Sequence, residues 1–261
     1  MQFKDQIGNT ITLNKPSERI VSLVPSQTEL LIDLVIKKNL VGITKFCVHP
    51  KELRKEIKVV GGTKSLHYDR VKALNPDLII CNKEENTKEM VVELQKIAPV
   101  WVSDIFSIED SFEMIRGLGE ICSCKKQATE LISKIISEKE SFKSFMDGKP
   151  IKKVAYVIWK KPLMIAGRDT FINHLLELNN FENICEEKSS RYPEVDEDFL
   201  KQADEILLST EPFPFKEKHA IKMSERLSKK VRIVDGEYFS WYGSRLLGAF
   251  EYFKGLHKQK N

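Results

Sequence analysis

The strongest constraint on the fold is a repeated order of short apolar, β-branched runs, each followed by a turn and an amphipathic stretch. The runs are RIVSLVP, LVGITKF, PDLIICN and PVWVSD in the first half of the chain, and KKVAYVIW, EILLST and VRIVD in the second. Strands that alternate with helices of about 10 to 15 residues are typical of βα units with a parallel sheet. The sequence therefore predicts an α/β fold.

One long helical stretch interrupts this order. Between residues 124 and 147 apolar side chains recur at helical spacing, and Gly148 and Pro150 then end the pattern. A helix of this length would extend over roughly 35 Å, and 261 residues are enough for two modest domains. We therefore expect two Rossmann-like βα lobes, residues 1–123 and 150–261, joined by one backbone helix over residues 124–149.

Two local signals refine the first lobe. Residues 3–13 alternate in polarity and turn at Gly8 and Asn9, which predicts a small β-hairpin. Ser26 and Glu29 have the spacing of a capping box before an apolar stretch, which predicts a helix that begins at Ser26.

Composition and motifs exclude several classes of protein. Hydrophobic residues make up 41% of the chain and charged residues 31%. This composition is ordinary for a globular protein. The net charge of +4 is spread along the chain, whereas a nucleic-acid binder gathers its basic residues into a stripe or tail. No phosphate-binding glycine loop, metalloprotease motif or nucleophile elbow occurs. We therefore expect a protein that is not an enzyme, has no intrinsic cofactor and binds no nucleic acid.

The five cysteines are an odd number in a chain too long to need a disulfide framework, so we expect free thiols. Two of them, Cys122 and Cys124, are close in sequence, but no second cluster accompanies them as a zinc site would require. Cys47 and His49 lie after a predicted strand, where α/β sheets bind ligands. With His67 they form an alternative hypothesis, a protein that binds a transition-metal ion directly.

Aromatic and acidic residues mark further candidate positions. Phe46 and the group Tyr238–Tyr242 follow predicted strands, and Tyr192 lies in a charged loop, SSRYPEVDEDF. Exposed aromatic clusters of this kind usually contact a ligand. Trp101 and Trp159 lie in or beside strands and are expected in the core. Asp69 and Asp198 each begin a helix that precedes a strand, so they occupy corresponding places in the two lobes.

The expected cellular location of the protein depends on whether a leader peptide preceded Met1. No window approaches 18 consecutive apolar residues, and the opening MQFKDQIGNTITL lacks a basic region followed by an apolar one. We expect a cytoplasmic protein if Met1 is the native start, and a periplasmic or cell-surface protein if a leader was removed.

A family resemblance is carried by four segments: RIVSLVPSQTELL, LVGITKFCVHP, VGGTKSLHYDRVKALNPDLIIC and, before a last helix, SWYGSR. With them the chain resembles the class III periplasmic substrate-binding proteins of ABC importers, which include receptors for vitamin B12, haem and ferric siderophores. The resemblance implies a ligand cleft between the two lobes. It also implies a receptor that delivers a corrinoid or another metal chelate to a permease dimer. We expect this receptor to be a monomer and to contact the membrane only through the permease.

The resemblance also assigns roles by position. Asp69 and Asp198 would dock onto arginines of the permease, one from each lobe. The residues that would contact the ligand are Phe46, Cys47, His49, Thr63, Lys64, Tyr192, Glu237, Tyr238, Trp241 and Tyr242. A cytoplasmic metallocofactor carrier or enzyme stays open as a further alternative, since the chain shows no leader.

Overall fold

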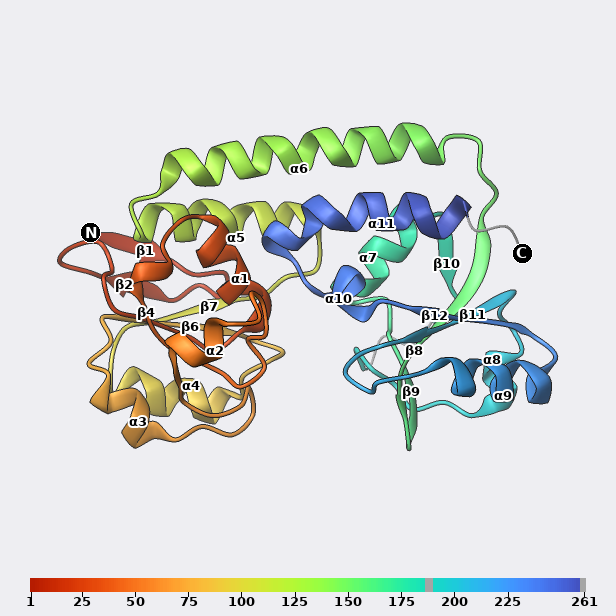
Figure 1. Ribbon diagram of the computed structural model, residues 1–261, viewed down its shortest axis with the longest axis horizontal. Coiled ribbons are helices and arrows are strands. Elements are labelled where there is room, and N and C mark those ends of the chain that lie inside the picture. Colours follow the sequence, from red (N-terminus) through yellow and green to blue (C-terminus); the bar gives the residue numbers. More distant parts are fainter. Residues whose placement is uncertain (186–189, 259–261) are drawn as a thin grey trace. The chain divides into compact units, whose positions relative to one another are not determined.

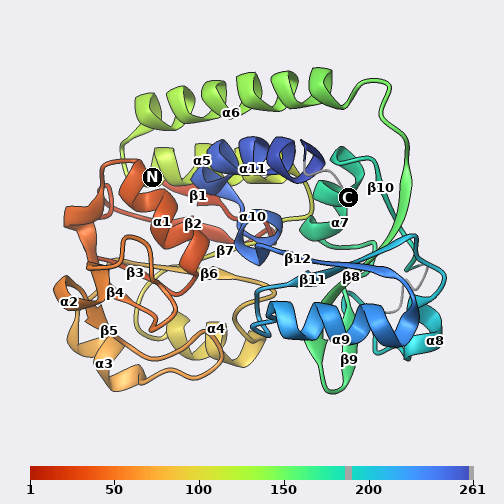
Figure 2. The same cartoon turned by 45° about the vertical axis from the view of Figure 1, so that its right-hand side comes forward.

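The computed structural model describes residues 1–185 and 190–258. The chain forms two compact units (Figures 1 and 2). Unit 1 comprises Met1–Ile105, Glu109–Ile136 and the short segment Tyr242–Arg245. Unit 2 comprises Phe106–Ile108, Ser137–Trp241 and the chain from Leu246 onward.

Unit 1 contains a parallel sheet in the order β5-β4-β3-β6-β7. Its strands are β3 (Ile20–Ser22), β4 (Leu40–Ile43), β5 (Lys58–Val59), β6 (Leu78–Asn82) and β7 (Val100–Ser103). The helices are α1 (Pro25–Asp33), α2 (Leu53–Glu56), α3 (Tyr68–Ala73), α4 (Lys88–Gln95) and α5 (Ile108–Ile121). The predicted hairpin is confirmed, with β1 (Gln2–Lys4) antiparallel to β2 (Thr10–Thr12).

The two faces of this sheet are covered by different helices. Val71 of α3 and Leu94 of α4 pack with Val100 and Val102 in one buried cluster. Trp101 points to the opposite face because side chains alternate along a strand. There it is 3% exposed, as predicted, and meets α5 at Gly117.

Helix α1 begins one residue earlier than predicted, and the expected capping box is wrong. Pro25 occupies the first turn and Val24 is the N-cap, without a side-chain cap bond. Proline is favoured at this position because its φ is already helical and it has no N–H to satisfy. Glu29 is instead paired with Arg245 of unit 1, whose Nε donates to Oε2 at 2.9 Å.

The long helix is confirmed as α6 (Lys125–Met146) (Figure 1). Its residues up to Ile136 belong to unit 1 and those from Ser137 to unit 2. In unit 2 its Phe142 packs against Phe253 of α11 (Leu246–Lys258), with ring centroids 5.7 Å apart. Neither α6 nor any other helix in the described part of the chain is long and apolar enough to cross a membrane.

Unit 2 repeats the architecture with a parallel sheet in the order β10-β8-β11-β12. Its strands are β8 (Lys152–Lys160), β10 (Phe181–Asn183), β11 (Glu205–Ser209) and β12 (Lys230–Val234), and β9 (Leu163–Ile165) returns antiparallel to β8. The helices are α7 (Phe171–Leu178), α8 (Glu197–Leu200), α9 (Glu217–Leu227), α10 (Gly236–Ser240) and α11. Two short 3₁₀ turns, η1 (Lys37–Asn39) in unit 1 and η2 (Gly243–Arg245), complete the chain.

Both faces of the second sheet are buried. Ala155 and Leu208 pack with Met223 of α9 on one face. On the other face the ring of Tyr156 lies 5.2 Å from that of Phe239 in α10. Trp159 does not join either cluster and is 38% exposed, so its predicted place in the core is wrong. It stands near the end of β8, where the last two residues of the strand are exposed.

Gly117 leaves the space that Trp101 fills. A Cβ atom at Gly117 would lie 2.5 Å from the Trp101 ring, which is buried and has no room to move. We expect Gly117→Val to lower the free energy of unfolding by about 1 to 3 kcal/mol through overpacking. The matched control is Gly255→Ala in α11, where nothing lies within 4 Å and better helix propensity should raise stability by up to about 1 kcal/mol. Urea unfolding would measure both, and a neutral Gly117→Val would contradict this packing.

Candidate functional site

The carboxyl ends of the strands in unit 1 carry a buried polar network. The amide of Gln27 donates to the hydroxyl of Ser103 and, at 3.2 Å, to that of Tyr242. The amide of Asn82 donates to the Ser103 hydroxyl at 3.1 Å. Burial raises the pKa of Tyr242 well above its ordinary value, so this phenol stays neutral at physiological pH. The network connects the ends of β6 and β7 with helix α1 and the segment that holds Tyr242.

The turn that holds Thr63 and Lys64 is fastened to the end of β6. The Asn86 amide donates to the Thr63 carbonyl at 2.9 Å, and Lys64 Nζ donates to the Glu84 carbonyl at 2.6 Å. Burial raises the pKa of Glu85, and the charge of Lys64 opposes that rise. The structure therefore brings Thr63 and Lys64 to the carboxyl edge of the sheet, as expected of a binding surface.

Phe46 and Cys47 follow β4 but point in opposite senses. Phe46 is 48% exposed, whereas Cys47 is 1% exposed. The Cys47 sulfur lies 3.1 Å from the Thr28 hydroxyl and 3.3 Å from the Thr44 hydroxyl, and burial raises its pKa. The thiol predicted to contact a ligand is therefore buried in this structure, whereas the contact of His49 with a ligand stays a prediction. Of Phe46 and Cys47, Phe46 is the one whose side chain is exposed to a ligand.

The direct metal-ion hypothesis gains no support. Within the described ranges, no group of three or more His, Cys, Asp or Glu side chains gathers in a way that could hold a metal ion, and this includes Cys47, His49 and His67. All five cysteines are free and buried. A thiol in such surroundings acts as a small apolar side chain.

The aromatic group after β12 is folded inward rather than exposed. Phe239 is fully buried, and Trp241 and Tyr242 are each 8% exposed. The Tyr238 ring stacks on Tyr252 of α11 at 4.7 Å. The predicted exposed cluster is wrong because the chain continues from β12 directly into α10, which packs against α11. Glu237, in the first turn of α10, is half-buried.

Tyr192 lies in a segment that runs along β9. The Ile165 N–H donates to the Pro193 carbonyl at 3.2 Å, and the Val195 N–H donates to the Leu163 carbonyl at 2.9 Å. Tyr192 itself is half-buried. Residues 193–195 of the predicted charged loop therefore pair with β9, Ser189 lies outside the described residues, and the contact of Tyr192 with a ligand stays a prediction.

Asp69 and Asp198 occupy corresponding places, as predicted. Each lies in the first turn of a short helix, α3 and α8, and each is exposed. Asp198 is paired with Lys201 at 2.6 Å, and this hydrogen bond and the lysine charge lower its pKa. Both carboxylates are therefore accessible to a partner.

The sequence analysis missed an aromatic cluster at the carboxyl end of β8. In unit 2 a chain of edge-to-face and tilted ring contacts joins Trp159, Phe213, Phe215 and His219. The signal was present as PFPFK after EILLST, where two phenylalanines alternate with prolines and cannot form a helix.

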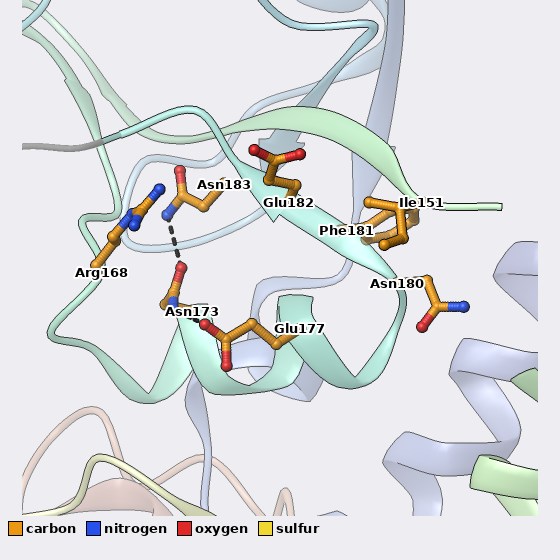
Figure 3. Close-up of a pocket in the computed structure, with 8 residues that line it drawn as sticks. All are labelled: Ile151, Arg168, Asn173, Glu177, Asn180, Phe181, Glu182 and Asn183. Carbon is orange, nitrogen blue, oxygen red and sulfur yellow. Dashed lines mark hydrogen bonds between the residues drawn. The ribbon is translucent and has the colours of Figure 1, made fainter.

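A pocket of about 330 Å³ opens beside β10 (Figure 3). Asn183 donates to the Asn173 side chain at 3.0 Å, and Asn173 donates to Glu177 at 2.8 Å. None of the predicted site residues lines this pocket. Since its amides satisfy one another, we do not include it in the candidate site.

A comparison with known protein families shows which family the chain belongs to. A family model described as periplasmic binding protein matches residues 20–220, which include strands of both sheets. This chain belongs to that family. The resemblance and the fold predicted from the sequence are thus confirmed. The family is one of solute-binding proteins.

Individual relatives agree with this assignment. The ABC transporter substrate-binding lipoprotein YvrC of Bacillus subtilis is 25% identical over 79% of this chain and 68% of that protein. The vitamin B12-binding protein of Salmonella paratyphi A is 27% identical over 68% of this chain and 66% of that protein. A periplasmic haem-binding protein from Pseudomonas aeruginosa has the same fold, with a TM-score of 0.79, 18% identity and coverage of 94% of both chains.

The buried thiols give a direct test of the site. Burial is the main cause that raises the pKa of Cys47, Cys81, Cys122 and Cys124, so few thiolates form at pH 8. We expect Ellman's reagent to label none of the five cysteines within minutes in the folded protein, and all five in guanidinium chloride. A thiol that reacts rapidly in the folded protein would contradict the placement of that cysteine.

Proposed function

We propose that this protein is the solute receptor of an ABC importer and that it captures a metal chelate, with a corrinoid as the first candidate. The observation that carries the proposal is the family match across both βα sheets. It is supported by relatives named as an ABC transporter substrate-binding lipoprotein and as vitamin B12-binding proteins. Their names also support a location outside the cytoplasm, either periplasmic or at the cell surface.

The proposed ligand surface is formed by the carboxyl ends of the strands, where α/β sheets bind ligands. Phe46 offers an exposed ring there, and the turn at Thr63 and Lys64 offers polar contacts. A flat ring buries the apolar plane of a macrocycle, at about 25 cal/mol per Å² of apolar area. The protein then acts by binding and release, and catalyses no reaction.

Asp69 and Asp198 are the proposed contacts with the permease. Both are exposed, charged and held on first turns of helices, which keeps their side chains on rigid elements. Carboxylates pair with arginine in two-pronged hydrogen bonds. Asp198 already has Lys201 as a partner, so docking would exchange one ion pair for another.

Binding of a chelate is the first test. Absorbance titration and calorimetry with cobalamin, cobinamide, haem and ferric siderophores should find at least one ligand with a Kd below about 10 μM. Phe46→Ala should weaken its binding about tenfold because the exposed ring is lost. The control is Val92→Ala in α4, which is 47% exposed but lies outside the strand ends. Absence of binding to every compound would refute the chelate receptor.

Transport tests the docking carboxylates separately. In vesicles that contain the permease, the double variant Asp69→Ala/Asp198→Ala should reduce uptake by roughly tenfold or more, because buried charge pairs lose their partners. Its affinity for the ligand should stay the same. The control double variant, Asp33→Ala/Asp169→Ala, removes two other exposed carboxylates. Equal uptake by the two double variants would exclude Asp69 and Asp198 as docking residues.

A further inference from the structure

An exposed tryptophan stands at the carboxyl end of β8 in unit 2 and is supported by other rings. Trp159 is 38% exposed and meets Phe213 edge to face, with centroids 5.7 Å apart. Phe213 in turn lies 4.6 Å from Phe215, and the His219 ring lies 5.7 Å from Phe215. The Trp159 indole N–H donates to the Lys161 carbonyl at 3.0 Å, which fixes the ring. A fixed, partly exposed ring is a preorganised contact surface.

Lysines surround this cluster without compensation. Lys160, Lys161, Lys216 and Lys218 are all exposed, and none forms an ion pair with a residue of the described ranges. Glu217 lies between Lys216 and Lys218 in sequence, in the first turn of α9, but forms no ion pair with either. We call Trp159, Phe213, His219 and these four lysines the aromatic–lysine surface.

His219 reports the electrostatic potential of this surface. Its Nδ1 accepts a hydrogen bond from the Lys216 N–H at 2.9 Å, so the proton of the neutral ring is on Nε2. Desolvation lowers its pKa, and the charges of Lys160, Lys218, Lys216 and Lys222 lower it further. The local potential is therefore positive, and an anion placed here would relieve the repulsion among the lysines.

The position of this surface connects it with ligand binding. Trp159 lies at the end of β8, and Phe213 lies in the connection that leaves β11, so both belong to the carboxyl edge of the sheet. We propose that the aromatic–lysine surface binds the flat part of the ligand on Trp159 and its negatively charged groups on the lysines, so that the receptor selects anionic chelates. This inference rests on the proposed function and adds the charge of the ligand to it.

A matched pair of ligands tests the charge requirement. Haemin carries two carboxylates, and haemin dimethyl ester has the same ring without them. In one buffer, haemin should bind at least tenfold more tightly than the ester, and a ferric tris-catecholate complex should bind more tightly than neutral cyanocobalamin. The affinity for the anionic ligands should fall with added salt because surface charges are screened. Tightest binding of a neutral ligand would overturn the inference while leaving the chelate receptor intact, whereas binding of none would overturn the receptor itself.

Variants assign the effect to these residues. Lys160→Gln/Lys216→Gln/Lys218→Gln should weaken haemin binding at least tenfold and leave the ester within twofold. The control is Lys126→Gln/Lys134→Gln/Lys143→Gln on α6, which changes the net charge by the same amount at exposed positions. It should leave the affinities for haemin and for the ester unchanged. Trp159→Ala should weaken the binding of both ligands, because both are expected to stack on the Trp159 ring. Equal effects of the two triple variants would overturn the inference.

His219 gives a readout that a structural role of the lysines would not change. Its pKa, followed by NMR, should rise when haemin binds and stay constant with the ester, because only a nearby negative charge favours the imidazolium. Lys160→Gln should also raise it in the free protein. A constant pKa on haemin binding would place the carboxylates elsewhere and refute the aromatic–lysine surface.

Discussion

Parallel pairing of the strands is the constraint on which the rest of the structure depends. It forces every strand of a sheet to end at the same edge, and it requires a helix or long connection after each strand to return the chain. Residues at the ends of different strands, such as Asn82 of β6 and Ser103 of β7, are therefore neighbours at one edge although they are far apart in sequence. The same geometry collects Trp159 and Phe213 in unit 2.

The edge in unit 1 is held by residues from both ends of the chain. Tyr242 joins Gln27 in the buried network, and Arg245 pairs with Glu29, with NH2 and Oε1 2.8 Å apart. Gly243 packs on Leu30 with a φ of +87°, which favours glycine. This short segment from the C-terminal part of the chain therefore packs on α1 of unit 1.

The sequence predicts regular features and misses those that depend on distant contacts. The βα order, the hairpin and α6 follow from periodicity, and they are present. Trp101 and Trp159 both sit in apolar strands, but their burial depends on whether a helix covers that point of the sheet. Tyr242 was expected at an exposed turn, whereas its hydroxyl is bonded to Gln27, which lies 215 residues earlier. No local pattern encodes such a partner.

The placement of exposed rings gives the candidate surface its chemical character. Among the described residues, the aromatic side chains that are exposed are Phe46, Phe106 and Trp159, and each lies at or just after the end of a strand. Lys45 lies over Phe46 at 5.1 Å, and Arg191 over Phe106 at 4.3 Å. Cations therefore accompany the exposed rings at the strand ends of both sheets. Within each unit taken by itself, this pairing of ring and cation is consistent with the proposed ligand, which has an apolar plane and negative charge at its periphery.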